Sequence, residues 1–158
     1  MPPRKRTAKR KVTGPLNQDR VMLDFAVLGD FAQVADGKLT IVGAGWNLIN
    51  AKQYPLQLPF GLGIGILIPW SETNTKHRFG FALEDADGIQ LLSSGGDVEA
   101  GRKPGMPAGM SQRVVLGVAG TLELRKPGAY VFVVSAGDDE KRITFEALPI
   151  PGLGGESS

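Results

Sequence analysis

The sequence of 158 residues contains no cysteine and only one histidine, His77. Without cysteine the chain can form no disulfide, no thiolate metal site and no cysteine nucleophile, and this composition fits a reducing compartment such as the cytoplasm. With a single histidine, the commonest general base and metal ligand is nearly absent. These absences argue against most catalysis, so we expect a protein that is not an enzyme and that needs no metal or cofactor.

Long apolar runs are also missing. The longest apolar stretch is 62–68, far short of the 18 or more residues that a membrane-spanning helix needs. The basic residues near the start are followed by 14–18, Gly-Pro-Leu-Asn-Gln, where a secretory signal would have an apolar segment. We therefore expect a soluble, cytoplasmic protein.

The positive charge is concentrated at the start of the sequence. Residues 1–20 contain seven of the 18 Lys and Arg but one of the 16 Asp and Glu, which leaves residues 21–158 with a net charge of −4. A basic segment without apolar residues for a core is expected to be disordered, and it can bind phosphates or another anionic surface. A segment that only increases solubility is the alternative. The candidate anion-binding residues are Arg4, Lys5, Arg6, Lys9, Arg10 and Lys11.

Between Val21 and Leu148 the apolar residues recur with a period of two, in short runs bounded by Gly, Pro and Asp. This pattern is typical of β-strands, and 22 Gly and 11 Pro interrupt the chain too often for long helices. We predict an all-β fold: an antiparallel β-sandwich, Ig-like or jelly-roll-like, of 7–9 strands, with a closed barrel as the alternative. The predicted parts are a basic flexible tail 1–20, a sandwich domain 21–150 and a flexible C-terminal tail 151–158.

Two stretches fit the strand pattern less well. Residues 23–34 could be helical in part, although Gly29-Asp30 interrupts them. Residues 93–110 are rich in Gly, Ser and Pro and are predicted to form a long loop, the most mobile internal segment, which could become ordered on binding.

In the segment 61–68, glycine alternates with branched aliphatic residues. If this segment is a strand, its glycines share one face and leave bare backbone there, which lets another group approach closely. We expect an aromatic side chain of the same chain to cover this glycine strip, with the two tryptophans as the nearest candidates. The alternative is a groove for a small molecule or peptide, formed by Trp46, Tyr54, Gly61, Gly63, Gly65 and Trp70.

Three short motifs imitate known binding sites without completing them. Residues 43–45, Gly-Ala-Gly, lack the third glycine and the helix of a dinucleotide site, so a bend is the better interpretation. Residues 96–103 have the spacing of a phosphate loop but contain two acids that would repel phosphate. Residues 85–88, Asp-Ala-Asp-Gly, supply too few oxygen ligands for calcium, so an acidic turn is the better interpretation.

Two segments carry a resemblance to a known family: 23–46, LDFAVLGDFAQVADGKLTIVGAGW, and 127–132, PGAYVF. They resemble segments of a family of small bacterial proteins, frequent in actinobacteria, that has no assigned activity. The resemblance covers roughly residues 22–148 and implies a β-sandwich but no functional residue. The Pro127-Gly128 pair is independently expected to form a turn, with Tyr130 packing its ring and bonding its hydroxyl at a corner of the sandwich.

From these observations we expect a non-enzymatic binding or assembly module that its basic tail attaches to an anionic partner, with a protein as the expected partner. One alternative is a nucleic-acid-associated accessory protein in which the tail contacts phosphates. Another is a small-molecule or peptide binder that uses the glycine strip. A hydrolase built on a carboxylate pair such as Asp24 and Asp30 has no positive support. Exposed sheet edges would also allow a homo-oligomer.

Overall fold

The computed structural model describes residues 19–150, and all their regular elements except one 3-10 turn are β-strands. The all-β prediction is confirmed, with ten strands instead of 7–9. The strands are β1 (Met22–Gly29), β2 (Phe31–Ala35), β3 (Lys38–Val42), β4 (Leu48–Ala51), β5 (Leu56–Ile68), β6 (His77–Asp85), β7 (Gln90–Val98), β8 (Gln112–Leu124), β9 (Gly128–Ala136) and β10 (Asp139–Pro149), and the 3-10 turn is η2 (Trp70–Glu72).

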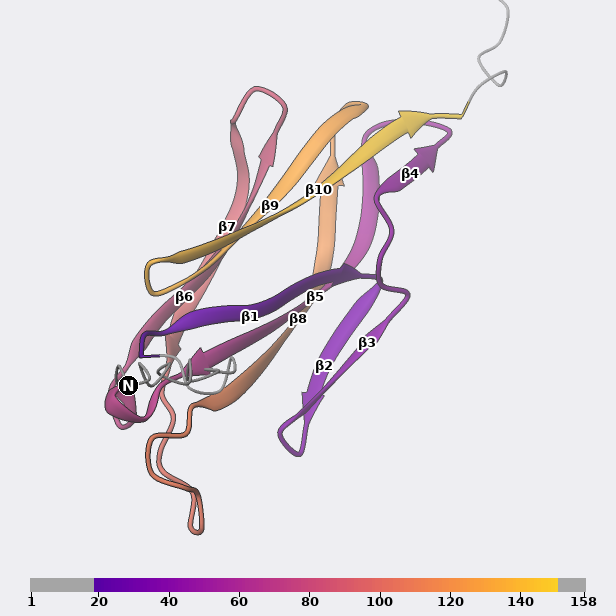
Figure 1. Ribbon diagram of the computed structural model, residues 1–158. Helices are drawn as coiled ribbons and strands as arrows, with labels where there is room; N and C mark the ends of the chain where they lie inside the picture. The colour runs from indigo at the N-terminus through magenta and orange to yellow at the C-terminus, as the bar shows by residue number, and fades with distance from the viewer. Residues whose placement is uncertain (1–18, 151–158) are drawn as a thin grey trace, which may run out of the picture.

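Two sheets form the layers of a sandwich (Figure 1). The first sheet has the strand order β1-β5-β8, and the second has the order β4-β10-β9-β6-β7. All neighbouring strands pair antiparallel except β4 and β10, which run parallel. The two sheets share no strand pairing among the described residues, so the sandwich is confirmed and the closed barrel is wrong.

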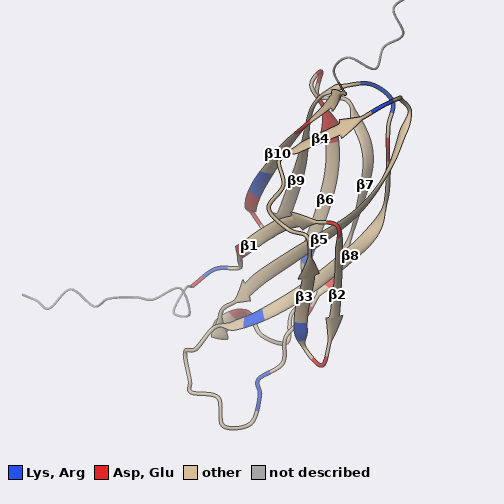
Figure 2. Cartoon of the chain, turned by 90° about the vertical axis from the view of Figure 1, so that its right-hand side faces the viewer, with Lys and Arg blue, Asp and Glu red and all other residues tan. Residues whose placement is uncertain are grey.

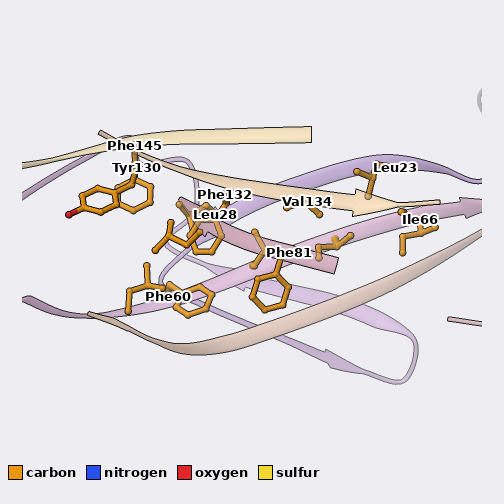
Figure 3. Packing of buried hydrophobic residues seen from close by; sticks show 14 of the residues in the cluster. Leu23, Leu28, Phe60, Ile66, Phe81, Tyr130, Phe132, Val134 and Phe145 are labelled. Atoms are coloured by element: carbon orange, nitrogen blue, oxygen red, sulfur yellow. The ribbon is translucent and has the colours of Figure 1, made fainter. Parts of the chain in front are cut away.

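The core lies between the two sheets, where side chains from both layers point toward one another (Figure 3). The rings of Phe60 on β5 and Phe132 on β9 have centroids 5.4 Å apart, and Phe132 lies 6.2 Å from Phe145 on β10. Burying a side chain of this size stabilises a fold by about 1.5–3 kcal/mol. The inward positions of β5 show the predicted period of two: Phe60, Leu62, Ile64, Ile66 and Ile68, all buried.

A third, small layer is the hairpin of β2 and β3, which pairs with neither sheet. Its turn consists of Asp36 and Gly37, both with positive φ (50° and 69°), as a tight two-residue hairpin turn requires. The hairpin packs on the outer face of the first sheet, against β5 and β8 (Figure 2). Chain segments therefore cover both faces of the first sheet.

The structure decides the alternative left open for 23–34 in favour of strands and corrects the bounds of the predicted loop. Residues 23–34 are not helical: they form β1 and β2, separated at Asp30. The predicted loop 93–110 begins later, because 93–98 belong to β7, where Gly95 pairs with Gly80 and Gly96 with Phe79. Backbone groups form the hydrogen bonds between β6 and β7, so small polar residues can take part in the pairing. The same residues weaken the alternation of apolar side chains by which a strand is predicted.

The expected corner at Tyr130 is confirmed. Its ring stacks on Phe145 with centroids 5.5 Å apart, and its hydroxyl donates a hydrogen bond to the carbonyl oxygen of Lys126. This bond joins the start of β9 to the segment that leaves β8. A buried ring with a satisfied hydroxyl fixes the reversal between the two sheets.

Candidate functional site

The basic residues 4–11 chosen as the anion-binding segment lie outside the described residues. The structure does locate the point at which the described chain begins. Asp19 and Arg20 lie at the end of the sandwich near η2 and the β9–β10 turn, beside a hollow of about 240 Å³ that Glu72, His77 and Asp139 also line. The chain that precedes residue 19 therefore joins the body at this end.

The same end of the molecule carries the connection 99–111 between β7 and β8, with Arg102 and Lys103 (Figure 2). The guanidinium of Arg102 lies 4.0 Å from the ring centroid of Trp70. It also donates hydrogen bonds to Thr73 Oγ1 (3.0 Å) and to the carbonyl oxygen of Trp70 (3.1 Å). A cation held over an aromatic ring and by two acceptors fixes the connection to η2. Arg102 thus has a structural partner within the chain.

The glycine strip of β5 is not an open groove. Gly61, Gly63 and Gly65 are all buried, and a Cβ placed on any of them would fall closer than 3.0 Å to other atoms. These atoms belong to the β2–β3 hairpin and to β1, so other segments of the same chain pack directly against the glycine strip. The covering groups are the backbone of Phe31 and Ala32, the side chains of Leu39 and Ile41, and the ring of Phe25.

The three aromatic residues grouped with the strip do not cover it. Trp46 packs edge-on against Phe145, 5.4 Å between centroids, and its Nε1 donates to Asp30 Oδ1 (3.1 Å). Tyr54 precedes β5, whereas Trp70 follows it. A strand of 13 residues is on the order of 40 Å long, so these two rings lie at opposite ends of the sandwich. The expected aromatic cover is confirmed at Gly65, where it is the ring of Phe25, and the choice of the two tryptophans for it is wrong.

Tyr54 has a structural environment of its own. Its hydroxyl donates to the carbonyl oxygen of Leu148 (3.1 Å) and so ties the chain before β5 to the end of β10. Burial raises the pKa of Tyr54, with a smaller contribution from the nearby Tyr130. Both effects favour the neutral phenol, which can donate this hydrogen bond.

Several titratable groups of the described body have local structural partners. His77 Nε2 lies 2.7 Å from the carbonyl oxygen of Glu72, and Asp24 forms an ion pair with Arg113. Asp85 accepts hydrogen bonds from the backbone of two residues of its own turn, at 2.9 Å each. Within residues 19–150 no three His, Asp or Glu side chains gather to hold a metal ion. Asp24 and Asp30 bond to different groups and do not form a pair.

The outer face of the second sheet carries a feature that the sequence did not predict. A hollow of about 450 Å³ lies over β6, β7 and β9, where Gly80, Gly95 and Ser135 are neighbours in the ladder. Its other lining residues include Ser93 and Arg78. The glycines and serines among these residues leave backbone accessible, and here no strand of the described chain pairs or packs above them.

The hollow borders β7, which is the edge strand of the second sheet (Figure 1). Ile89 just before this strand and Leu91 within it are 59% and 41% exposed. Leu83 pairs with Leu92 and Glu84 pairs with Gln90, so Leu91 is an extra residue without a partner on β6. Such a bulge re-aims a side chain at a sheet edge. The available sequence signal was the uncharged stretch 89–96, Ile-Gln-Leu-Leu-Ser-Ser-Gly-Gly.

No helix within residues 19–150 is long and apolar enough to cross a membrane. A family model described as "Family of unknown function (DUF6941)" matches residues 24–147, nearly the whole described body. This agrees with the resemblance seen in the sequence. No curated protein matches the chain.

Proposed function

The chain belongs to this family of unknown function, and from that premise we propose that it is a non-enzymatic binding or assembly module that its basic segment attaches to an anionic partner. The separation of charge along the chain carries this proposal. Residues 1–18 contain six Lys and Arg and no Asp or Glu. Residues 19–158 contain twelve Lys and Arg and sixteen Asp and Glu. The body, with a net charge of −4, repels a polyanion, so attraction has to come from the basic segment.

Local pairing of the body's cations supports the same proposal. Arg113, Arg125 and Arg142 each form an ion pair with a carboxylate, and so does Lys126. Arg102 is held against Trp70. These contacts partly neutralise the positive charge of the body, and the basic segment remains the densest run of cations in the sequence. We place the protein in a bacterial cytoplasm, in keeping with the absence of cysteine.

The test compares the full chain with a variant in which all six basic residues of 4–11 are glutamine. A control variant makes the same change of net charge in the body, with glutamine at Lys38, Lys52, Lys76, Arg78, Lys103 and Lys141. Three labelled probes are titrated at low salt: duplex DNA, poly-glutamate, and vesicles that contain phosphatidylserine. We expect the full chain and the body control to bind at least one probe, and the tail variant to lose about 100-fold in affinity because counterion release scales with the phosphates neutralised.

Salt dependence distinguishes the partners. With six phosphate contacts, log affinity for duplex DNA falls with log salt at a slope of about −5, and the tail variant removes most of this slope. Binding confined to DNA would assign a nucleic-acid-associated role, while binding confined to poly-glutamate would favour an acidic protein surface. The proposal fails if the full chain binds none of the probes, or if both variants lose the same affinity.

A further inference from the structure

The connection 99–111 between β7 and β8 carries an apolar tip, residues 104–110, whose composition the fold does not explain. The tip has the sequence Pro-Gly-Met-Pro-Ala-Gly-Met, and five of these seven residues are exposed. Other turns of the body are polar, such as 85–88 and 137–140. No residue of the tip belongs to the hydrophobic core of residues 19–150 or packs against it. An exposed segment without polar side chains that the core does not need indicates a binding surface.

Two consecutive turns of the same kind shape the apolar tip. In each turn the N–H of the last residue donates to the carbonyl oxygen of the first, at 3.1 Å in 103–106 and at 3.3 Å in 107–110. The third residue of each turn is a glycine with positive φ, Gly105 (79°) and Gly109 (81°), as in a type II turn. Each turn ends in a methionine. The tip therefore has a defined backbone conformation that presents its two thioether side chains at equivalent positions.

The backbone of the apolar tip has few N–H groups that need water. Pro104 and Pro107 have no N–H group, and the N–H groups of Met106 and Met110 are used within the two turns. Four of the seven residues therefore need no outside acceptor. An unpaired backbone donor is costly to move out of water, and this cost normally keeps loops out of an apolar medium. In the tip the cost is reduced.

Cations flank the apolar tip on both sides. Arg102 and Lys103 precede it and Arg113 follows it, and residues 100–122 contain no Asp or Glu. Lys103 and Arg113 line a hollow of about 460 Å³ together with the two methionines of the tip. Of the three cations, Lys103 has no carboxylate partner within residues 19–150, and Arg102 is held against an aromatic ring. Apolar groups and positive charge thus occur on the same small surface.

The apolar tip lies at the end of the sandwich at which the basic segment joins the body. Figure 1 and Figure 2 both show the connection projecting beyond the strands at this end, with the acidic β9–β10 turn, residues 137–140, farther back. Lys11 precedes Asp19 by eight residues, which span at most about 28 Å when extended. Because the tip and the basic segment share one end, a single flat surface can contact both.

We propose that the apolar tip inserts into the surface of a lipid bilayer that contains anionic lipids, while the basic segment binds the headgroups. This inference rests on the proposed function, since it identifies the anionic partner of the basic segment as a membrane. A nucleic acid offers phosphates alone, whereas a bilayer offers phosphates for the cations and an apolar medium for the tip. Peripheral attachment to a membrane usually needs two such signals, an apolar anchor and a polybasic patch. The tip enters to the boundary between headgroups and acyl chains, about 5–10 Å deep.

Two exposed alanines give a matched test. Ala108 lies in the apolar tip and Ala86 in the β6–β7 turn, at opposite ends of the nine-residue strand β7. Ala108→Asp and Ala86→Asp change the net charge equally. On vesicles of phosphatidylcholine and phosphatidylserine, Ala108→Asp should weaken binding of the full chain about tenfold, because a carboxylate is costly at the lipid boundary and anionic lipid repels it. Ala86→Asp should leave the affinity unchanged.

Tryptophan at the same two positions measures insertion directly. Tryptophan favours the membrane interface, so Ala108→Trp should bind the vesicles more tightly than the unsubstituted chain. When the acyl chains carry bromine, the added fluorescence of Ala108→Trp should be quenched and that of Ala86→Trp should not. The unsubstituted chain provides the background from Trp46 and Trp70.

The outcomes separate this inference from the proposed function. The inference is overturned if the full chain does not bind the vesicles, if the two Asp variants bind equally, or if bromine quenches both added tryptophans alike. Binding of duplex DNA or poly-glutamate in place of vesicles would overturn the membrane as the partner and leave the proposed function standing. If the variant with glutamine throughout 4–11 binds the vesicles as tightly as the full chain and Ala108→Trp is quenched, insertion of the tip is supported and the proposed function alone fails.

Discussion

Both sheets of the sandwich carry glycines on their outer faces, but only one set is covered by the chain. Over Gly61 and Gly63 the β2–β3 hairpin, and over Gly65 the ring of Phe25 on β1, approach so closely that a Cβ has no room. On the second sheet, a Cβ at Gly95 would fall 2.5 Å from the backbone oxygen of Phe79 on the neighbouring strand, but no other layer covers it, and a Cβ at Gly80 would meet Ser135 Oγ and a backbone oxygen at 3.4 Å, an ordinary contact distance. The same residue type therefore serves close packing on one face and leaves an accessible hollow on the other.

This difference shows what a glycine strip in a sequence can indicate. It marks a place where another group approaches the backbone, but it does not say whether that group belongs to the same chain. In the first sheet the group is the hairpin, which is local in sequence and folds back onto β5. In the second sheet nothing in residues 19–150 fills the place. The four predictions below test this contrast through the free energy of unfolding, from the largest effect to the smallest.

Gly61→Val should lower the free energy of unfolding most, by about 3 kcal/mol. Its side chain meets the backbone of Phe31 and Ala32, which cannot rotate away. Urea denaturation monitored by circular dichroism would measure it. A loss below ~1 kcal/mol would mean that the hairpin is not held tightly against β5.

Gly63→Ala should cost about 1–2 kcal/mol, because its Cβ meets the flexible ends of Ile41 and Leu39. Ile41→Ala removes one of these ends and should itself destabilise the fold by a similar amount. In the double variant the new methyl group occupies part of the vacated space. A double-mutant cycle should therefore show a favourable coupling of about 1 kcal/mol, and simple additivity would contradict direct contact.

Asp30→Ala should destabilise the protein by about 1 kcal/mol, because it removes the acceptor of the Trp46 Nε1 hydrogen bond at the base of the hairpin. Asp30→Asn keeps a side-chain oxygen at the same place and should lose less. The pair of variants separates the hydrogen bond from packing, and tryptophan fluorescence would report whether Trp46 moves. Equal losses in both variants would show that the carboxylate acts through its charge alone.

Gly80→Ala should have the smallest effect, between no change and a gain of about 0.5 kcal/mol. The added methyl group finds room, and the unfolded chain loses conformational freedom. Thermal unfolding of Gly80→Ala and of Gly61→Val under the same conditions compares the packing of the two outer faces. A loss for Gly80→Ala as large as that for Gly61→Val would show that the second face is packed as tightly as the first.

The sequence predicted the strands that alternate clearly and the turns with specific chemistry. The alternation in 61–68 identified β5, and the Pro127-Gly128 pair identified the turn between β8 and β9. It missed β4, whose residues Leu48–Ala51 are too few to show a period and whose partner β10 lies almost 100 residues away.

The candidate site was predictable only in part. Charge counting along the sequence was enough to select the basic segment, because clustering of cations is local. The alternative that placed a groove at the glycine strip was wrong, because a hairpin that packs on the outer face of a sheet leaves no signal in strand periodicity. The hollow beside β7 could not be predicted either, because Gly80, Gly95 and Ser135 come together only through the order of the strands.

The amino-acid sequence alone determined the class of structure and the layout of charge, because strand period, turn chemistry and net charge depend on near neighbours. It also determined which strand lacks side chains on one face. Only the tertiary structure decided what lies against that face and which strand became an edge. These features depend on contacts between segments far apart in sequence, and the free energy of packing the whole core selects them.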